Sequence, residues 1–119
     1  MLNLDTHILI HALNGDLTAR EKRLLSENPW SISSIVIWEI TKLAQLGRIE
    51  MDVQSLYFRR VLAQVQVWPL DLEVCRRTTE LDFRGDPADE IIAATSIAHR
   101  VPLLTRDRRM RESKVVPLA

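Results

Sequence analysis

The stretch GDPADEIIAATSIAHRVPLLT, residues 85–105, carries the clearest structural signal in the chain. Asp86 followed by Pro87 is typical of a helix N-terminus, because Asp can accept hydrogen bonds from the first free amides and Pro fits the first helical position. A nearly all-apolar, Ala-rich segment follows, and the run at 101–105 is typical of a buried strand. The stretch therefore predicts a helix leading into a strand, the repeating unit of an α/β protein.

The same alternation extends over all 119 residues. Apolar runs predict strands at 1–4, 30–33, 67–70, 101–105 and 114–118, where Pro117 makes the last one suited to a sheet edge. Further helices are expected at 18–27 behind a Thr18–Glu21 capping box, from 34 to Gly47, at 52–64 capped by Asp52, and at 71–81. We expect one domain, 1–119, with a three-layer α/β/α fold around a mostly parallel sheet.

Composition excludes several classes of protein. Lysine and arginine number 16, as do aspartate and glutamate, so only a local basic patch could attract nucleic acid. The single cysteine cannot form an internal disulfide. No apolar run approaches the roughly 20 residues that span a bilayer, and no export signal is visible at the start. We therefore expect a cytoplasmic protein with no membrane partner.

Acidic residues follow the predicted strands at the edge where α/β proteins place their chemistry. Asp5 comes directly after the first strand and Asp107 after the fourth, while Asp89 opens the helix that feeds the fourth strand. Glu39 lies on the flank of the apolar stripe of its own helix, where an acid is unusual. The sequence therefore predicts that these four carboxylates meet at one edge of the sheet.

Each acid also has an ordinary structural explanation. Asp86 as an N-cap, worth about 1 kcal/mol, explains itself completely. Asp5 and Asp107 could each cap the helix that follows, and Glu39 could form a weak surface pair with Lys42. Acids in a first helical turn are favoured by the helix dipole. Only the shared edge favours the functional interpretation.

Four carboxylates in one place repel one another, and a divalent cation removes that cost. An all-oxygen set of ligands selects Mg²⁺ or Mn²⁺ over zinc. His7 and His11 stand four residues apart but lack a further soft ligand, so we interpret them as structural or rim residues. In this interpretation Asp86 holds the helix end, Asp89 is aimed at metal, and Glu90 is a bystander.

Three segments carry a family resemblance: LDTHILIHAL (4–13), SSIVIWEITKLAQLGRI (33–49) and GDPADEIIAATSIAHRVPLLTRD (85–107). Together they resemble the PIN domain, and more narrowly the VapC family of toxin nucleases. The family's acidic set then falls on Asp5, Glu39, Asp89 and Asp107. The resemblance implies an endoribonuclease dependent on Mg²⁺ or Mn²⁺, usually a homodimer, that is the toxin of a pair and is neutralised by an antitoxin. Glu90 and His11 depart from the usual pattern, at positions that concern substrate contact.

Metal-assisted hydrolysis by water would leave a 5′-phosphate on the RNA product. Thr6 and Thr105 could orient a carboxylate or a water, with hydrogen bonding to the backbone as the alternative, and Asp86 could assist them. A basic cluster beside the site offers Arg106, Arg108 and Arg109 as RNA contacts. The tryptophans at 30, 38 and 68 are expected to pack in or beside the core, so base stacking on aromatic platforms is not supported.

Two rival functions stay open on the sequence alone. A PIN-like module without activity would bind RNA or a protein and would not cut. A receiver-type phosphoacceptor has a similar length and a Mg²⁺ pocket of acids, and here Asp71, after the third predicted strand, would be its acceptor. The fifth predicted strand ends in PLA without the lysine that a receiver needs.

Overall fold

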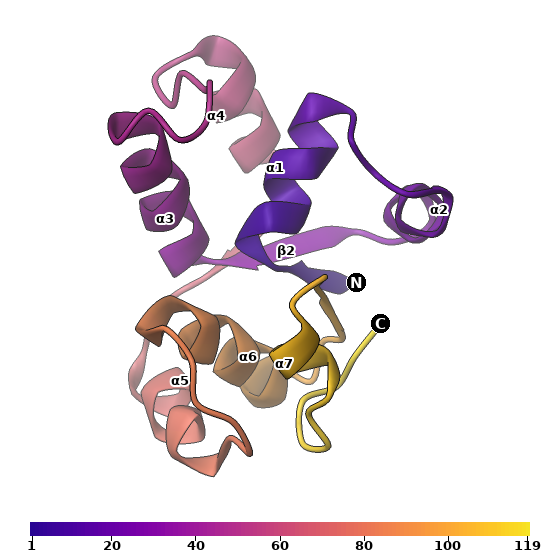
Figure 1. The fold of residues 1–119 in the computed structure, drawn as a ribbon, viewed down its shortest axis with the longest axis vertical. Helices are drawn as coiled ribbons and strands as arrows, with labels where there is room; N and C mark the ends of the chain where they lie inside the picture. Colours follow the sequence, from indigo (N-terminus) through magenta and orange to yellow (C-terminus); the bar gives the residue numbers. More distant parts are fainter.

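A computed structural model describes residues 1–119. The chain forms a four-stranded sheet with helices on both faces (Figure 1). The elements in chain order are β1 Leu2–Leu4, α1 Thr6–Asn14, α2 Ala19–Glu27, β2 Trp30–Ser33, α3 Ser34–Gln45, α4 Leu56–Ala63, β3 Gln66–Trp68, α5 Leu72–Arg77, a 3₁₀ turn Thr78–Glu80, α6 Pro87–His99, β4 Leu103–Leu104 and α7 Arg108–Arg111. None of these helices is both long and apolar enough to cross a membrane.

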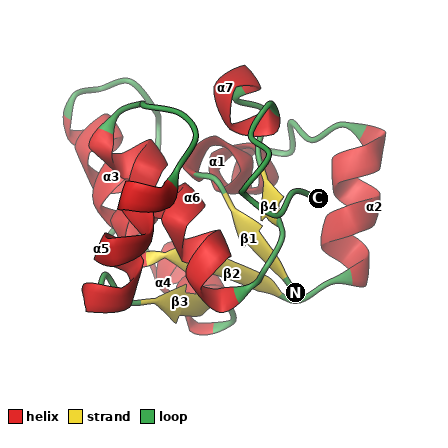
Figure 2. Ribbon diagram, turned by 90° about the horizontal axis from the view of Figure 1, so that it is seen from below, coloured by secondary structure: helices red, strands yellow, loops and turns green.

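The sheet has the order β3-β2-β1-β4, and every pair of neighbouring strands is parallel. In Figure 1 the sheet is seen nearly edge-on, with α1, α3 and α4 on one side and α5 and α6 on the other. Figure 2 looks onto the sheet past α5 and α6 and shows the four strands side by side. The predicted three-layer α/β/α fold with a parallel sheet is therefore confirmed.

The core forms where β1 is covered on both faces. Leu4, Ile8, Ile32 and Ile92 come from different elements and are fully buried in one apolar cluster. Asn3 is the polar exception in the middle of β1, also fully buried, with its Nδ2 donating to the Ile92 carbonyl at 3.2 Å and to Ser96 Oγ at 2.9 Å. These hydrogen bonds fix α6, which carries Asp89, against β1, which Asp5 directly follows.

The first two predicted strands are confirmed almost to the residue, whereas the later ones are shorter or absent. The third ends before Pro69, which lacks the N–H that a continuing strand would need. The fourth is reduced to Leu103–Leu104, just after Pro102. The prediction of a fifth strand at 114–118 was wrong. Only one bridge joins Leu103 to Leu118, and the Pro117 carbonyl accepts from the Leu103 amide at 2.8 Å.

Helix boundaries follow their caps, with two corrections. The capping box of α2 is present, and α3 is followed by Gly47 in the left-handed region at φ 71°. Asp52 does not cap α4, because its carboxylate accepts from the Gln54 amide in a turn and Ser55 is the N-cap. The helix predicted at 71–81 ends at Arg77 and continues only as a 3₁₀ turn.

Candidate active site

The candidate site lies at the carboxyl ends of β1 and β4, where the strand order changes direction. The chain runs outward from β1 through β2 to β3, while β4 lies on the other side of β1, and such a switch point is the preferred place for ligands in a parallel sheet. Leu4 is paired with Leu104, and the Asp5 amide donates to the Leu104 carbonyl at 3.0 Å. Residues that follow the two strands are therefore held side by side.

Asp5 is the most buried of the four acids, with 4% of its surface exposed. Its Oδ1 accepts from the Thr6 amide at 2.8 Å, and its Oδ2 accepts from Thr105 Oγ1 at 2.6 Å. Burial raises the pKa of the Asp5 carboxyl, and the hydrogen bonds from Thr105 and Thr6 oppose that rise. Thr105 thus orients a carboxylate, and its Oγ1 also accepts from the Asp107 amide at 3.0 Å.

Glu39 faces Asp5 from α3, and the hydroxyl of Thr6 donates to its Oε1. Burial raises the pKa of Glu39, and the negative charge of Asp5 raises it further. The alternative of a surface pair with Lys42 was wrong, because Lys42 Nζ donates to Gln45 Oε1 at 3.0 Å. Each of the two hydroxyls therefore donates to one carboxylate, and Thr105 also meets the backbone alternative, since it accepts from the Asp107 amide.

Asp89 is the electrostatic centre of the cluster. It lies in the first turn of α6, and its pKa is raised to about 6 from an ordinary value of 3.8. Burial is the largest cause, and the negative charges of Asp5, Glu39 and Asp107 add to it. Acids separated by as many as 102 positions in the chain therefore lie close enough to repel one another.

The neighbours of Asp89 have exchanged the roles predicted for them. Asp86 occupies the N-cap position of α6, but its side chain makes no capping hydrogen bond. Glu90, predicted to be a bystander, accepts from the Gly85 amide through Oε2 at 3.1 Å and so ties the preceding loop to the helix.

Asp107 does cap its helix, since Oδ1 accepts from the Met110 amide at 3.1 Å. Its ordinary structural role is therefore real and leaves Oδ2 without a hydrogen-bond donor.

The donor set fits a hard divalent cation by its chemistry. All four groups are carboxylates, and the repulsion that raises the pKa of Asp89 is what a bound cation relieves. No three Asp, Glu, His or Cys side chains are yet arranged around one point as ligands. Binding of a cation would therefore require side chains to rotate. Asp86 and Asp107 have carboxylate oxygens that are free of hydrogen bonds and could turn toward the ion.

The three tryptophans divide into two groups. Trp30 packs as predicted, with Nε1 donating to the Leu25 carbonyl at 2.9 Å, and Trp68 stacks on His99 with their ring centres 3.9 Å apart. Trp38 does not pack in the core, because 55% of its surface is exposed. His7 is exposed near the site, where its charge lowers the pKa of Asp5 and Glu39.

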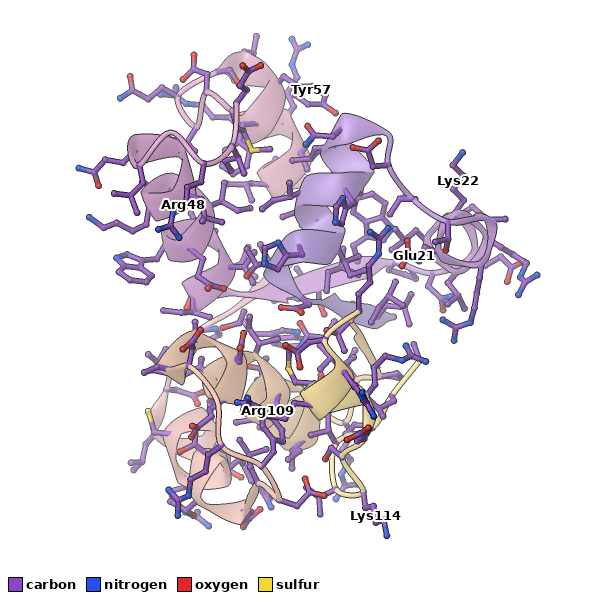
Figure 3. The ribbon with its side chains drawn as sticks, viewed as in Figure 1. Glu21, Lys22, Arg48, Tyr57, Arg109 and Lys114 are labelled. Carbon is purple, nitrogen blue, oxygen red and sulfur yellow. The ribbon has the colours of Figure 1, made fainter.

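The three arginines predicted to contact RNA differ in how far they are already engaged. Arg106 donates to Glu21 at 2.6 Å and to the Asp16 carbonyl at 2.9 Å. Arg109 donates to the Arg84 carbonyl and lies in front of α6, well away from Glu21 (Figure 3). Arg108 is far more exposed and pairs only with Glu112, at 2.9 Å. The geometry thus favours Arg108 and Arg109 over Arg106 as substrate contacts.

The Glu21–Arg106 pair ties α2 to the loop that holds Thr105 and Asp107. Hydrogen bonding by Arg106 lowers the pKa of Glu21 to about 2. Sequence reasoning assigned Glu21 only to the capping box of α2. No local pattern indicates a partner 85 positions away.

Replacement of Glu21 by Gln is expected to destabilise the protein by about 1–2 kcal/mol at pH 7. Gln keeps the capping box but removes the charge that Arg106 faces, and Arg106 is partly exposed, so the loss stays below that of a fully buried pair. Because the folded pKa is the lowered one, the contribution is present above pH about 4.5 and is lost as pH falls toward 2. Urea denaturation at pH 7 and pH 3 measures both values.

The matched control for this variant is Glu27→Gln, an exposed acid on the same helix. It is expected to change the free energy of unfolding by less than about 0.5 kcal/mol at either pH. An equal loss in both variants would show that the net charge of α2 matters and the Arg106 contact does not.

Comparison with known proteins adds a family and a fold. The chain matches the family model of the PIN domain over residues 3–115. It is 33% identical over 87 residues to Ribonuclease VapC22 of Mycobacterium tuberculosis, and the alignment covers 71% of this chain and 67% of that protein. The fold is similar to VapBC2 from Rickettsia felis bound to a DNA fragment of its promoter, with a TM-score of 0.74, 21% identity, and 100% of this chain and 98% of that one covered. A toxin–antitoxin complex from Klebsiella pneumoniae gives a TM-score of 0.70 and 24% identity, with 94% and 91% covered.

Proposed function

Because this chain belongs to the PIN domain family and to its VapC branch, we propose that it is an endoribonuclease dependent on Mg²⁺ or Mn²⁺ that acts as the toxin of a toxin–antitoxin pair. The observation that carries the proposal is the mutual repulsion of four carboxylates from four separate parts of the chain. The cost of that repulsion has no structural purpose in a metal-free protein. It favours a site built to hold a cation.

Asp5, Glu39, Asp89 and Asp107 are the residues that would hold the metal. When bound, a divalent cation lowers the pKa of a water molecule and neutralises charge on the phosphate. Thr105 and Thr6 keep Asp5 and Glu39 oriented through the hydrogen bonds described above. Hydrolysis by water gives products with a 5′-phosphate, and Arg108 and Arg109 would bind the phosphates of the RNA chain.

The partners we propose are RNA as substrate, a cognate antitoxin and a second copy of the chain, in the cytoplasm. The fold neighbours from Klebsiella pneumoniae and Rickettsia felis are themselves toxin–antitoxin assemblies, which supports the antitoxin. The homodimer is supported by family membership alone. An antitoxin could reach the site, since Asp107 and Arg108 are exposed at its rim.

The test is cleavage of a structured RNA by the purified protein with Mg²⁺ or Mn²⁺. We expect 5′-phosphate products, no cleavage in EDTA, and a loss on the order of 100-fold or more in Asp5→Asn, which keeps the shape and the capping oxygen of the side chain. Cleavage by Asp5→Asn at the parent rate would identify a contaminant and remove the site. Metal binding without cleavage would favour the inactive binding module.

The receiver-type alternative was wrong. Receiver sheets have the order 2-1-3-4-5, with the first strand between the second and the third, whereas β1 here lies between β2 and β4. Asp71, the acceptor that this alternative needs, caps α5 through the Val74 amide at 2.9 Å. It is not among the acids that raise the pKa of Asp89.

A further inference from the structure

Trp38 is exposed beside the carboxylate cluster, where nothing in the fold requires an aromatic side chain. It precedes Glu39 on α3, and 55% of its surface is open to solvent. Trp is usually well buried because of its large apolar area, and an exposed Trp near a site is informative for binding. Neither of the other tryptophans shares this position, since Trp30 and Trp68 are packed against the protein.

Trp38 forms one wall of a groove between α3 and α6. Ile35 belongs to the same wall, Pro87 and Ile91 line the opposite side, and the space measures about 470 Å³, within the usual range of about 300–1,000 Å³ for small-ligand sites. The polar end of the groove is formed by Glu39 and Asp86. Because Glu39 also belongs to the carboxylate cluster, the groove borders the candidate active site.

The chemistry of the groove selects among the parts of an RNA chain. No basic side chain lines the groove, so it offers a phosphate no partner of opposite charge. A nucleobase is flat, neutral and able to stack on an aromatic face, with a contribution of about 1–3 kcal/mol per base. Asp86 makes no side-chain hydrogen bond within the protein, so its carboxylate is free to accept one from an exocyclic amine of the base.

We propose that this groove is a base-binding subsite in which Trp38 stacks a nucleobase of the RNA next to the phosphate that is cut. The proposal rests on the proposed ribonuclease function and adds what that function lacks, a group that fixes the position of the substrate along its chain. Stacking tolerates every base, so the subsite serves placement more than sequence recognition.

The test compares steady-state cleavage of a short single-stranded RNA by the parent and by Trp38→Ala and Trp38→Phe. We expect Trp38→Ala to raise KM roughly 5- to 150-fold, with a smaller effect on kcat, and Trp38→Phe to recover most of the loss. Tyr57→Ala is the matched control, because Tyr57 is equally exposed on α4 and lies away from α6 (Figure 3). It is expected to leave KM unchanged.

A second substrate tests the contact itself. Removing one base beside the cleavage site of the same RNA is expected to raise KM in the parent and to have no further effect in Trp38→Ala. An unchanged KM in an active, folded Trp38→Ala overturns the subsite and leaves the ribonuclease intact. A change of oligomeric state in Trp38→Ala, measured by sedimentation, with KM unchanged would assign the residue to a protein interface and also overturn it. A parent that cuts no RNA overturns the ribonuclease and the subsite together.

Discussion

Asp89→Asn is expected to make the metal-free protein more stable at pH 7 while it abolishes RNA cleavage. The pKa of Asp89 is raised to about 6 by burial and by the charges of Asp5, Glu39 and Asp107, so the folded state prefers the neutral side chain. At pH 7 Asp89 is charged, so the stability that the neutral side chain gives the folded state is lost. Asn has nearly the same shape and is neutral at every pH, so it removes the repulsion.

The direction and size of the effect follow from linkage. A raised pKa contributes stability that is complete below about pH 4 and disappears as pH rises through 6. The shift of about two units corresponds to roughly 3 kcal/mol at most, and screening of a half-buried group reduces this to on the order of 1 kcal/mol. Urea denaturation in EDTA at pH 4 and pH 7 should show the gain of Asp89→Asn at pH 7 only.

The adjacent acid supplies the control for this prediction. Glu90→Gln changes the same charge one position along α6, but Glu90 serves the Gly85 amide, and Gln keeps an oxygen for that bond. We expect Glu90→Gln to leave the free energy of unfolding close to that of the parent and the cleavage rate within a factor of a few of it. If Asp89→Asn is less stable than the parent at pH 7 in EDTA, the four carboxylates do not repel as described. If it still cuts RNA at the parent rate, Asp89 holds no metal.

The acids could be predicted to converge because their signal is local. A residue directly after a parallel strand lies at a known edge, and that rule alone brings Asp5 and Asp107 together. The exchange of roles between Asp86 and Glu90 could not be predicted, because it depends on the path of the loop before α6: Asp86 makes no capping bond, and Glu90 reaches back to the Gly85 amide. Local cap patterns therefore predict helix starts better than they predict which acid is left free.

The exposure of Trp38 and the loss of the fifth strand could not be predicted for a different reason. Trp38 fits the apolar pattern of α3, and the absence of a covering element shows only in three dimensions. The fifth predicted strand failed because apolar composition does not guarantee a ladder, and Pro117 leaves one bridge where several hydrogen bonds were expected. In both places the sequence pattern correctly identifies apolar residues. Whether they pack in the core, pair in a sheet or stay exposed depends on their neighbours in the tertiary structure.

Asn3→Ala is expected to destabilise the fold by about 2–4 kcal/mol and to weaken cleavage by the protein that stays folded. Asn3 is fully buried, and its replacement removes the side-chain donor to the Ile92 carbonyl and to Ser96 Oγ and leaves a cavity beside them. The same bonds hold α6 on β1 and so set the distance between Asp89 and Asp5. A displacement near 1 Å can cost about 100-fold in rate.

Ser31→Ala separates the positional effect of Asn3 from a general loss of stability. Ser31 is equally buried on the neighbouring strand, and its Oγ donates to the Leu2 carbonyl of β1 at 2.9 Å, so its hydrogen bond does not involve α6. We expect it to cost about 1 kcal/mol and to leave kcat/KM unchanged. Denaturant titration gives the stabilities, and cleavage is measured below the onset of unfolding for each variant. Should Asn3→Ala lose stability but keep the parent kcat/KM, the position of α6 must be set by its apolar contacts, and Asn3 contributes to folding alone.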